Sequence, residues 1–315
     1  MQKPIVVVGS INLDLVVGAE RIPQVGETII GDSFNTFYGG KGANQAVAAA
    51  KLGYPVSMVG NVGSDAFGTQ LRHGLKDAGV DTAYVNTVEG PSGVALITTG
   101  RRGENNIVVV PGANGRFTPE LLEQASPLLK RAGFLLAQLE IPLETVEYLA
   151  QFAERNNIPL MLDPAPAHRL SEKLLRRLTW ITPNETETRE LLKSSVENGN
   201  DGSYAAADRL LACGVKNVLL KLGSNGCVIA EGTLAKKHIP AFSVDAVDTT
   251  AAGDAFNAGF AVGLMRGSSV ARSAVFASAV AAISVTRPGA QPSMPTGDEV
   301  GRFLDEHSVA TAKQR

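Results

Sequence analysis

Short, unbroken apolar runs that alternate with helical segments are the feature of this sequence that most constrains its fold. The first run, residues 5–8, reads IVVV and ends at Gly9. Runs of this kind between turn residues are typical of strands that are buried on both faces of a sheet. Most of the segments between the runs place apolar residues at helical spacing. The alternation predicts a mostly parallel β-sheet with helices on both of its faces.

The predicted strands of this sheet occupy residues 5–8, 56–59, 134–137, 159–162, 180–182 and 218–222. The predicted helices occupy residues 43–52, 67–78, 119–130, 143–156, 184–192, 204–213, 252–265, 270–284 and 297–304. No obvious linker divides the sequence. We therefore expect residues 1–315 to form one α/β domain.

Two stretches of the chain, residues 14–38 and 94–110, break the alternation. The first contains strand-like pieces at 16–18, 27–30 and 34–38, and the second combines pieces at 93–98 and 106–110 around a polar turn. Such pieces are typical of hairpins rather than of βα units. We expect them to form a small discontinuous β-sheet that acts as a lid and excludes water from a reacting group. An antiparallel edge of the main sheet is the alternative.

Composition and charge exclude several classes of protein. Apolar residues make up 44% of the chain and the net charge is −2, with no basic block, so we expect a folded protein that binds neither nucleic acid nor a membrane. Cys213 and Cys227 lie far apart without CxxC spacing, which favours a reducing, cytoplasmic location. The N-terminus resembles a first strand and not a signal peptide.

The segment DTTAAGD, residues 248–254, carries the clearest chemical signal. It precedes a helical run, and its Ala251, Ala252 and Gly253 leave backbone N–H groups open to a ligand at the helix N-terminus, where an anion is favoured. Asp254 follows in the first turn and provides a base beside that anion site. This combination is what phosphoryl transfer to an alcohol requires. A plain helix cap is the alternative.

Polar residues also follow several of the predicted strands. Asn12 and Asp14 come after the first strand, and Glu140 comes after the run at 134–137. Ligands of open α/β sheets bind outside the carboxyl ends of the strands. Asn12 and Asp14 therefore suit sugar hydroxyls, although Asn and Asp also favour turns.

Two glycine-containing segments are further candidates. Residues 39–44 read GGKGAN; they lack the GK[ST] ending of a P-loop, but the glycines permit close contact with a polar ligand, and Asn44 can bind sugar hydroxyls. Residues 223–226 read GSNG and suit either nucleotide phosphates or a hairpin turn. Asn184 and Glu187 suit either Mg²⁺ and phosphate or a capping box.

Taken together, these segments resemble the ribokinase-like, or PfkB, carbohydrate kinases over nearly the whole chain. The resemblance rests on VVVGSINLD, YGGKGANQAVAAAKLG, GVALI, QLEIPLE, DPAPA, ITPNETE, LGSNG, AVDTTAAGDAFNAG and VTRPGAQPSMP. It implies a doubly wound α/β/α core, a small β-sheet lid that pairs with a second lid in a homodimer, and ATP, Mg²⁺ and a K⁺ activator.

The resemblance also implies roles for matching positions. Asp254 is the expected base, with Ala251, Ala252 and Gly253 as the anion hole. The expected sugar-binding residues are Asn12, Asp14, Gly40, Lys41, Asn44 and Glu140. The expected nucleotide and Mg²⁺ positions are Asn184, Glu187, Lys221, Gly223, Ser224, Asn225, Gly226, Gly253 and Ser278. The expected K⁺ positions are Asp248, Thr250, Ser284, Arg287, Gly289 and Ser293.

The activity that the resemblance implies is ATP-dependent phosphorylation of a pentose, D-ribose to D-ribose 5-phosphate. Kinases of 2-deoxyribose, a hexose or a nucleoside are alternatives on the same fold, because their sugar pockets differ by few residues. A sugar or nucleotide sensor without activity is an alternative of another class, which the intact Asp254 disfavours. Three features depart from the family pattern: Lys221 stands where a small hydroxyl residue is common, Ser278 replaces a larger residue, and Arg101 and Arg102 are unusual near a lid turn.

Overall fold

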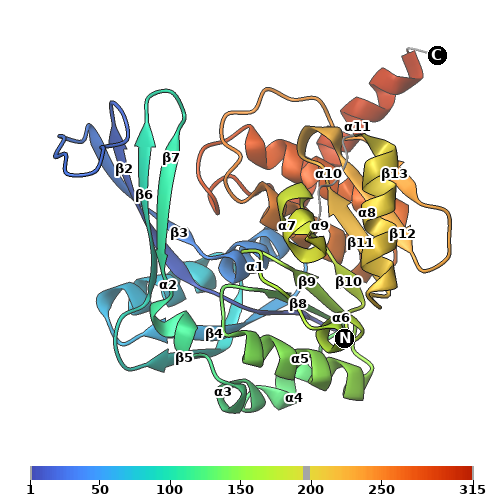
Figure 1. The fold of residues 1–315 in the computed structure, drawn as a ribbon, viewed down its shortest axis with the longest axis horizontal. Helices are drawn as coiled ribbons and strands as arrows, with labels where there is room; N and C mark the ends of the chain where they lie inside the picture. Colours follow the sequence, from blue (N-terminus) through green and yellow to red (C-terminus); the bar gives the residue numbers. More distant parts are fainter. Residues whose placement is uncertain (1, 194–198, 314–315) are drawn as a thin grey trace.

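The computed structural model describes residues 2–193 and 199–313, and these residues form a nine-stranded main sheet (Figure 1). Its order is β13-β12-β11-β10-β9-β8-β1-β4-β5, parallel from β11 to β5, with β12 and β13 added antiparallel. The strands are β1 (Ile5–Val8), β4 (Val56–Gly63), β5 (Asp81–Val88), β8 (Phe134–Gln138), β9 (Leu160–Asp163), β10 (Trp180–Ile181), β11 (Asn217–Lys221), β12 (Cys227–Glu231) and β13 (Lys237–Ile239).

Helices cover both faces of this sheet and give three layers. All four residues of β1 are buried, with Ile5 and Val7 in the core on one face and Val6 and Val8 in the core on the other. One face carries α1 (Lys41–Lys51), α2 (Ala66–Asp77), α9 (Ala252–Met265), α10 (Val270–Val285) and α11 (Gly297–Lys313). The other carries α3 (Pro119–Glu123), α4 (Ser126–Leu129), α5 (Leu143–Asn156), α6 (Glu172–Leu175), α7 (Glu185–Leu192) and α8 (Asn200–Ala212). The predicted α/β/α fold is confirmed.

The chain winds outward from β1 in both directions. It runs first to β4 and β5 and later continues on the opposite side of β1 through β8, β9, β10 and β11. The strand order therefore reverses between β1 and β8. In open α/β sheets such a switch point opens a crevice at the carboxyl ends of the strands.

A second sheet of four strands stands beside the main body (Figure 1). Its order is β3-β2-β6-β7, from β2 (Asn12–Ala19), β3 (Ser33–Gly39), β6 (Gly93–Gly100) and β7 (Asn105–Val110). This small sheet is separate from the main sheet, which rules out an edge of the main sheet for the two stretches that break the alternation. Because β2 starts four residues after β1 ends, the small sheet is joined directly to the switch point.

Two expectations about individual elements were wrong, and two strands were not predicted. Residues 27–30 are not a strand, because Glu27 takes part in a turn in which its N–H donates to the Gln24 carbonyl, and Ile30 is exposed. The helix predicted at residues 119–130 is two short helices, since Pro127 has no N–H to continue the hydrogen-bond ladder. The strands β5 and β13 were not predicted.

Candidate active site

Asp254 is the buried carboxylate at the centre of the site. It lies in the first turn of α9 and is 4% exposed. The N-cap residue is Ala251, which has a left-handed backbone with φ of 59°. Asp254 therefore does not cap the helix, and its carboxylate is free for other partners.

Two neighbouring amides of α1 hold this carboxylate. Asn44 Nδ2 donates to Asp254 Oδ2 at 3.0 Å, and Gln45 Nε2 donates to Asp254 Oδ1 at 3.1 Å. The oxygen of each amide in turn accepts a hydrogen bond: Gln291 Nε2 donates to Asn44 Oδ1, and Gln138 Nε2 donates to Gln45 Oε1. The carboxylate is thus oriented by a chain of buried amides.

Residues from both sides of the switch point meet next to α1. Ser10 Oγ donates to Glu140 Oε2 at 2.5 Å, and the Lys41 N–H donates to the same oxygen at 3.1 Å. Gly40 precedes the helix with φ of 87°, and a Cβ there would lie 2.7 Å from the Asn12 nitrogen. A glycine is required at this position for both reasons.

Asn12 and Asp14 lie on β2, the strand that leaves the switch point. The buried Asn12 accepts a hydrogen bond of 2.7 Å from Asn114 Nδ2. Burial, together with the nearby carboxylates of Glu140 and Asp254, raises the pKa of Asp14 to about 7. A polar ligand that donates hydrogen bonds to Asp14 would stabilise its charged form.

Charge in this region is dominated by carboxylates around Lys41. Burial acts to lower the pKa of Lys41, but the fields of Asp254, Asp163 and Glu140 outweigh it and raise that pKa. Burial raises the pKa of Asp254 to about 6, although Lys41 and the two amides act in the opposite direction. Lys41 is therefore a permanent cation beside Asp254.

A pocket of about 440 Å³ lies on the other side of the N-terminus of α9. Of the predicted nucleotide residues, Lys221, Gly223, Ser224, Gly226, Gly253 and Ser278 line it. A Cβ built on Gly253 would meet only Lys221 Nζ, at 3.5 Å, so the backbone there is open toward the pocket. Residues 223–226 also connect the antiparallel pair β11 and β12, which confirms the hairpin turn; the nucleotide role of GSNG stays a prediction.

Asn184 and Glu187 form a capping box at the start of α7. Asn184 Oδ1 accepts from the Glu187 N–H, and Glu187 Oε2 accepts from the Asn184 N–H, both at 2.8 Å. Neither residue lines the pocket, nor does Asn225. Burial raises the pKa of Glu187 while Lys221 lowers it, so Glu187 lies within the field of that lysine.

The loop before α9 and the loop after α10 meet at Asp248. Its carboxylate accepts from the Thr250 N–H and hydroxyl and from the Gly289 N–H, and these bonds lower its pKa against the effect of burial. Among the other predicted K⁺ positions, the hydroxyls of Ser284 and Ser293 bond to nearby carbonyls. The Arg287 side chain instead pairs with Glu299 at 2.6 Å.

Sequence reasoning missed three residues of the site: Gln45, Asn114 and Asp163. Asp163 ends β9 and pairs with Lys221 Nζ at 2.9 Å, with both side chains largely buried. Gln45 Nε2 also donates to Asp163 Oδ2 at 3.2 Å. Two signals in the sequence pointed to Asp163, which stands at a strand end and is the first residue of the DPAPA motif.

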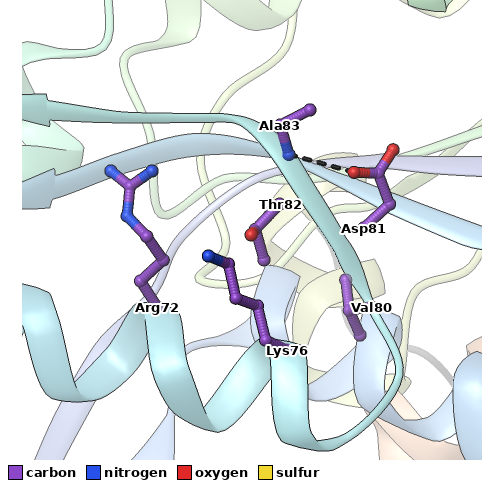
Figure 2. Close-up of a pocket in the computed structure, with 6 residues that line it drawn as sticks. All are labelled: Arg72, Lys76, Val80, Asp81, Thr82 and Ala83. Carbon is purple, nitrogen blue, oxygen red and sulfur yellow. Dashed lines mark hydrogen bonds between the residues drawn. The ribbon is translucent and has the colours of Figure 1, made fainter.

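A second hollow, of about 410 Å³, lies between α2 and β5 (Figure 2). Arg72 and Lys76 border it from α2, and Asp81 accepts a hydrogen bond from the Ala83 N–H on its other side. None of the predicted site residues lines it. Within residues 2–193 and 199–313 there is no cluster of three or more acidic, His or Cys side chains suited to a metal, and no helix with the length and apolarity of a membrane span.

Comparison with known proteins agrees with this geometry. Residues 2–297 match the model of the "pfkB family carbohydrate kinase". The chain belongs to the pfkB family of carbohydrate kinases. It is 40% identical to a ribokinase of Haemophilus influenzae, over 97% of this chain and 99% of the relative. It is 37% identical to a deoxyribokinase of Salmonella typhi, over 95% of this chain and 98% of that relative.

Solved structures of pfkB kinases share the whole fold. The structure of Arabidopsis thaliana ribokinase complexed with ribose and ATP superposes with a TM-score of 0.91 at 37% identity, covering 96% of this chain and 99% of that one. The three-layer core and the small sheet are therefore the ribokinase-like fold, and the chain is a kinase of this family.

Proposed function

We propose that this pfkB kinase phosphorylates D-ribose at its 5-hydroxyl with ATP, and that Asp254 is the base. The observation that carries the proposal is the position of the Asp254 carboxylate. It lies between the pocket of about 440 Å³ and a polar cluster at the switch point, which consists of Asn12, Asp14, Asn44 and Glu140. The Arabidopsis relative, complexed with ribose and ATP, supports these two ligands.

The polar cluster supplies groups suited to sugar hydroxyls. Asn12, Asp14, Asn44 and Glu140 provide acceptors and amide donors, and Gly40 and Lys41 bring the backbone close to the ligand. Asp14 lies on a strand of the small sheet, so a sugar bound there would touch the small sheet directly. We propose on this basis that residues 14–38 and 94–110 serve as the lid of a single domain.

In the proposed reaction the 5-hydroxyl oxygen attacks the γ-phosphorus of ATP. The bond from that phosphorus to the bridging oxygen breaks, ADP leaves, and the hydroxyl proton passes to Asp254. A carboxylate with a pKa of about 6 is far too weak to form the alkoxide beforehand, so it takes the proton late in the transfer. The N–H group at Gly253 faces the charge that develops on the phosphoryl oxygens, whereas the Ala252 N–H donates to the Thr249 carbonyl at 3.2 Å and is not an open donor as the sequence suggested.

The residues present fit the two expected metal ions. The carboxylates of Asp254, Asp163, Glu140 and Glu187 surround Lys41, and this excess of negative charge favours a divalent cation. Mg²⁺ is usually bound by one or two carboxylates, water and phosphates, and Asn184 with Glu187 suits that mode. When bound, Mg²⁺ would neutralise charge on the phosphates. Asp248 and the carbonyls of the adjoining loops suit K⁺, which would order the turn at Ala251.

We also propose a homodimer formed through the small sheet. Large apolar side chains are exposed on it, namely Phe34, Leu96, Ile107, Val108, Val109 and Val110. An exposed apolar patch of this kind is typical of an interaction surface. Use of ATP and two free cysteines favour the cytoplasm as the place of action.

The direct test is ADP release from ATP·Mg²⁺ with D-ribose and 2-deoxy-D-ribose as separate acceptors, each in K⁺ and in Na⁺. Fast turnover on ribose that K⁺ enhances is the expected result. Turnover on neither sugar would reject the substrate assignment. Turnover on deoxyribose alone would favour the second candidate, which the deoxyribokinase relative keeps open.

A further inference from the structure

The ion pair between Asp163 and Lys221 joins the two halves of the site. Asp163 ends β9 and Lys221 ends β11, and their side chains are 4% and 12% exposed. Lys221 lines the pocket next to Gly253, and Gln45 links Asp163 to Asp254 through two hydrogen bonds from one nitrogen. A continuous chain of contacts therefore runs from Lys221 through Asp163 and Gln45 to Asp254.

Stability alone does not account for a pair at this depth. Removing two charges from water costs about as much as their attraction returns, so a buried ion pair is weak evidence for a stabilising role. The other ion pairs of the described residues leave at least one partner more than 12% exposed. The Asp163–Lys221 pair is the deeply buried one, and its ammonium is next to the backbone of the proposed anion hole.

We propose that Lys221 binds the γ-phosphoryl group of the nucleotide, and that Asp163 is a positioning residue that holds the Lys221 ammonium and, through Gln45, keeps it aligned with Asp254. This inference rests on the proposed function, because it assumes a nucleotide in the pocket. An ammonium at this place is attracted to the phosphoryl oxygens as negative charge develops on them. Gln45 fixes how far the cation lies from the base.

Nucleotide binding tests the contact without any sugar. In calorimetric titrations with Mg²⁺, Lys221→Met should weaken binding of a non-hydrolysable ATP analogue about 10-fold or more and binding of ADP less than about 3-fold. Lys221→Arg should retain part of the preference for the triphosphate. Lys236→Met is the matched control, since Lys236 pairs with Asp208 outside the pocket. Equal losses for both nucleotides in Lys221→Met would overturn the proposal.

A cycle of variants separates positioning from stability. Asp163→Asn removes the ion-pair partner of the buried Lys221, so it should lower both Tm and kcat, with the KM for the sugar unchanged within about 2-fold. The double variant Asp163→Asn/Lys221→Met removes both charges and should recover Tm. Its kcat and its nucleotide preference should stay at the level of Lys221→Met.

The outcomes of this cycle are distinct from failure of the proposed function. If the double variant regains the nucleotide preference or kcat together with Tm, the pair is structural only and the inference is wrong. If the native protein phosphorylates neither ribose nor deoxyribose, the substrate assignment fails, whereas the ratio of triphosphate to diphosphate affinity still decides the role of Lys221.

Discussion

Asn44 Nδ2 lies 3.0 Å from Asp254 Oδ2, although 210 residues separate them in the chain. Asn44 belongs to the helix that follows the small sheet, and Asp254 belongs to the helix that borders the nucleotide-sized pocket. The bond therefore connects the residues that we propose for the sugar with the pocket that we propose for the phosphates. It also fixes the direction in which the carboxylate presents its oxygens.

Replacing the proposed base should reduce turnover with little effect on binding. Asp254→Asn keeps the size of the side chain but cannot accept a proton, so kcat should fall about 10²–10⁴-fold. Sugar affinity, measured by titration in the absence of ATP, should change only a few-fold. Near-normal kcat would reject the role of Asp254.

The pH dependence of kcat/KM should report the protonation of Asp254 in the free enzyme. Burial raises the pKa of this group to about 6, with Lys41 lowering it and Asp163 raising it, so the deprotonated base is lost as the pH falls through about 6. We expect kcat/KM to decline toward a tenfold loss per pH unit below that value. Lys41→Met should shift this decline in kcat/KM to higher pH, because Lys41 lowers the pKa of Asp254. A flat profile between pH 5 and 8 would contradict the assignment.

Ala251 offers a test of the turn at the anion hole. Its φ of 59° puts a residue with a Cβ in the left-handed region, at a cost of roughly 1–2 kcal/mol relative to glycine. Ala251→Gly relieves this strain but increases the conformational entropy of the unfolded chain. Tm should therefore rise slightly or stay level, with kcat retained. Ala251→Val should lower both, because a β-branched residue tolerates this backbone poorly. Tm and kcat should be measured for both variants. The same change in Tm and kcat for Ala251→Gly and Ala251→Val would contradict a strained backbone at Ala251.

Asp14 should oppose folding at neutral and alkaline pH. Its pKa rises from 3.8 to about 7 in the folded protein, so its stabilising contribution is complete below pH 3.8 and is lost as the pH rises toward 7. Asp14→Asn should therefore raise Tm more at pH 8 than at pH 5, while weakening the affinity for ribose. The same gain in Tm at both pH values would show that the charge of Asp14 is not responsible.

The main sheet could be predicted from the sequence because its central strands are buried on both faces. Ile5–Val8 is an unbroken apolar run for this reason. The edge strand β5 (Asp81–Val88) was not predicted because only Thr82 and Val85 are buried, so the segment shows neither an unbroken apolar run nor a regular period of two. The failure at residues 27–30 has the opposite cause, since apolar residues there have no neighbouring strand to pair with.

The site could be predicted only where the signal was local. Gly253 and Asp254 lie together in one motif at a helix start, and the family resemblance reinforced it. Gln45, Asn114 and Asp163 were missed because their partners lie between 58 and 209 residues away, and a single sequence does not show which distant residues are in contact. The pattern at Asn184 and Glu187 remained ambiguous because a capping box uses the same residue types as the proposed magnesium motif.

The separation of Asn44 from Asp254 also has a consequence for biosynthesis. At translation rates of about 5–20 residues per second, roughly 10–40 s pass between the synthesis of one and the synthesis of the other. During that interval the Asn44 and Gln45 amides have no Asp254 carboxylate to bind. A nascent chain acquires the complete site only when its last quarter has been made, so unfinished chains are catalytically silent.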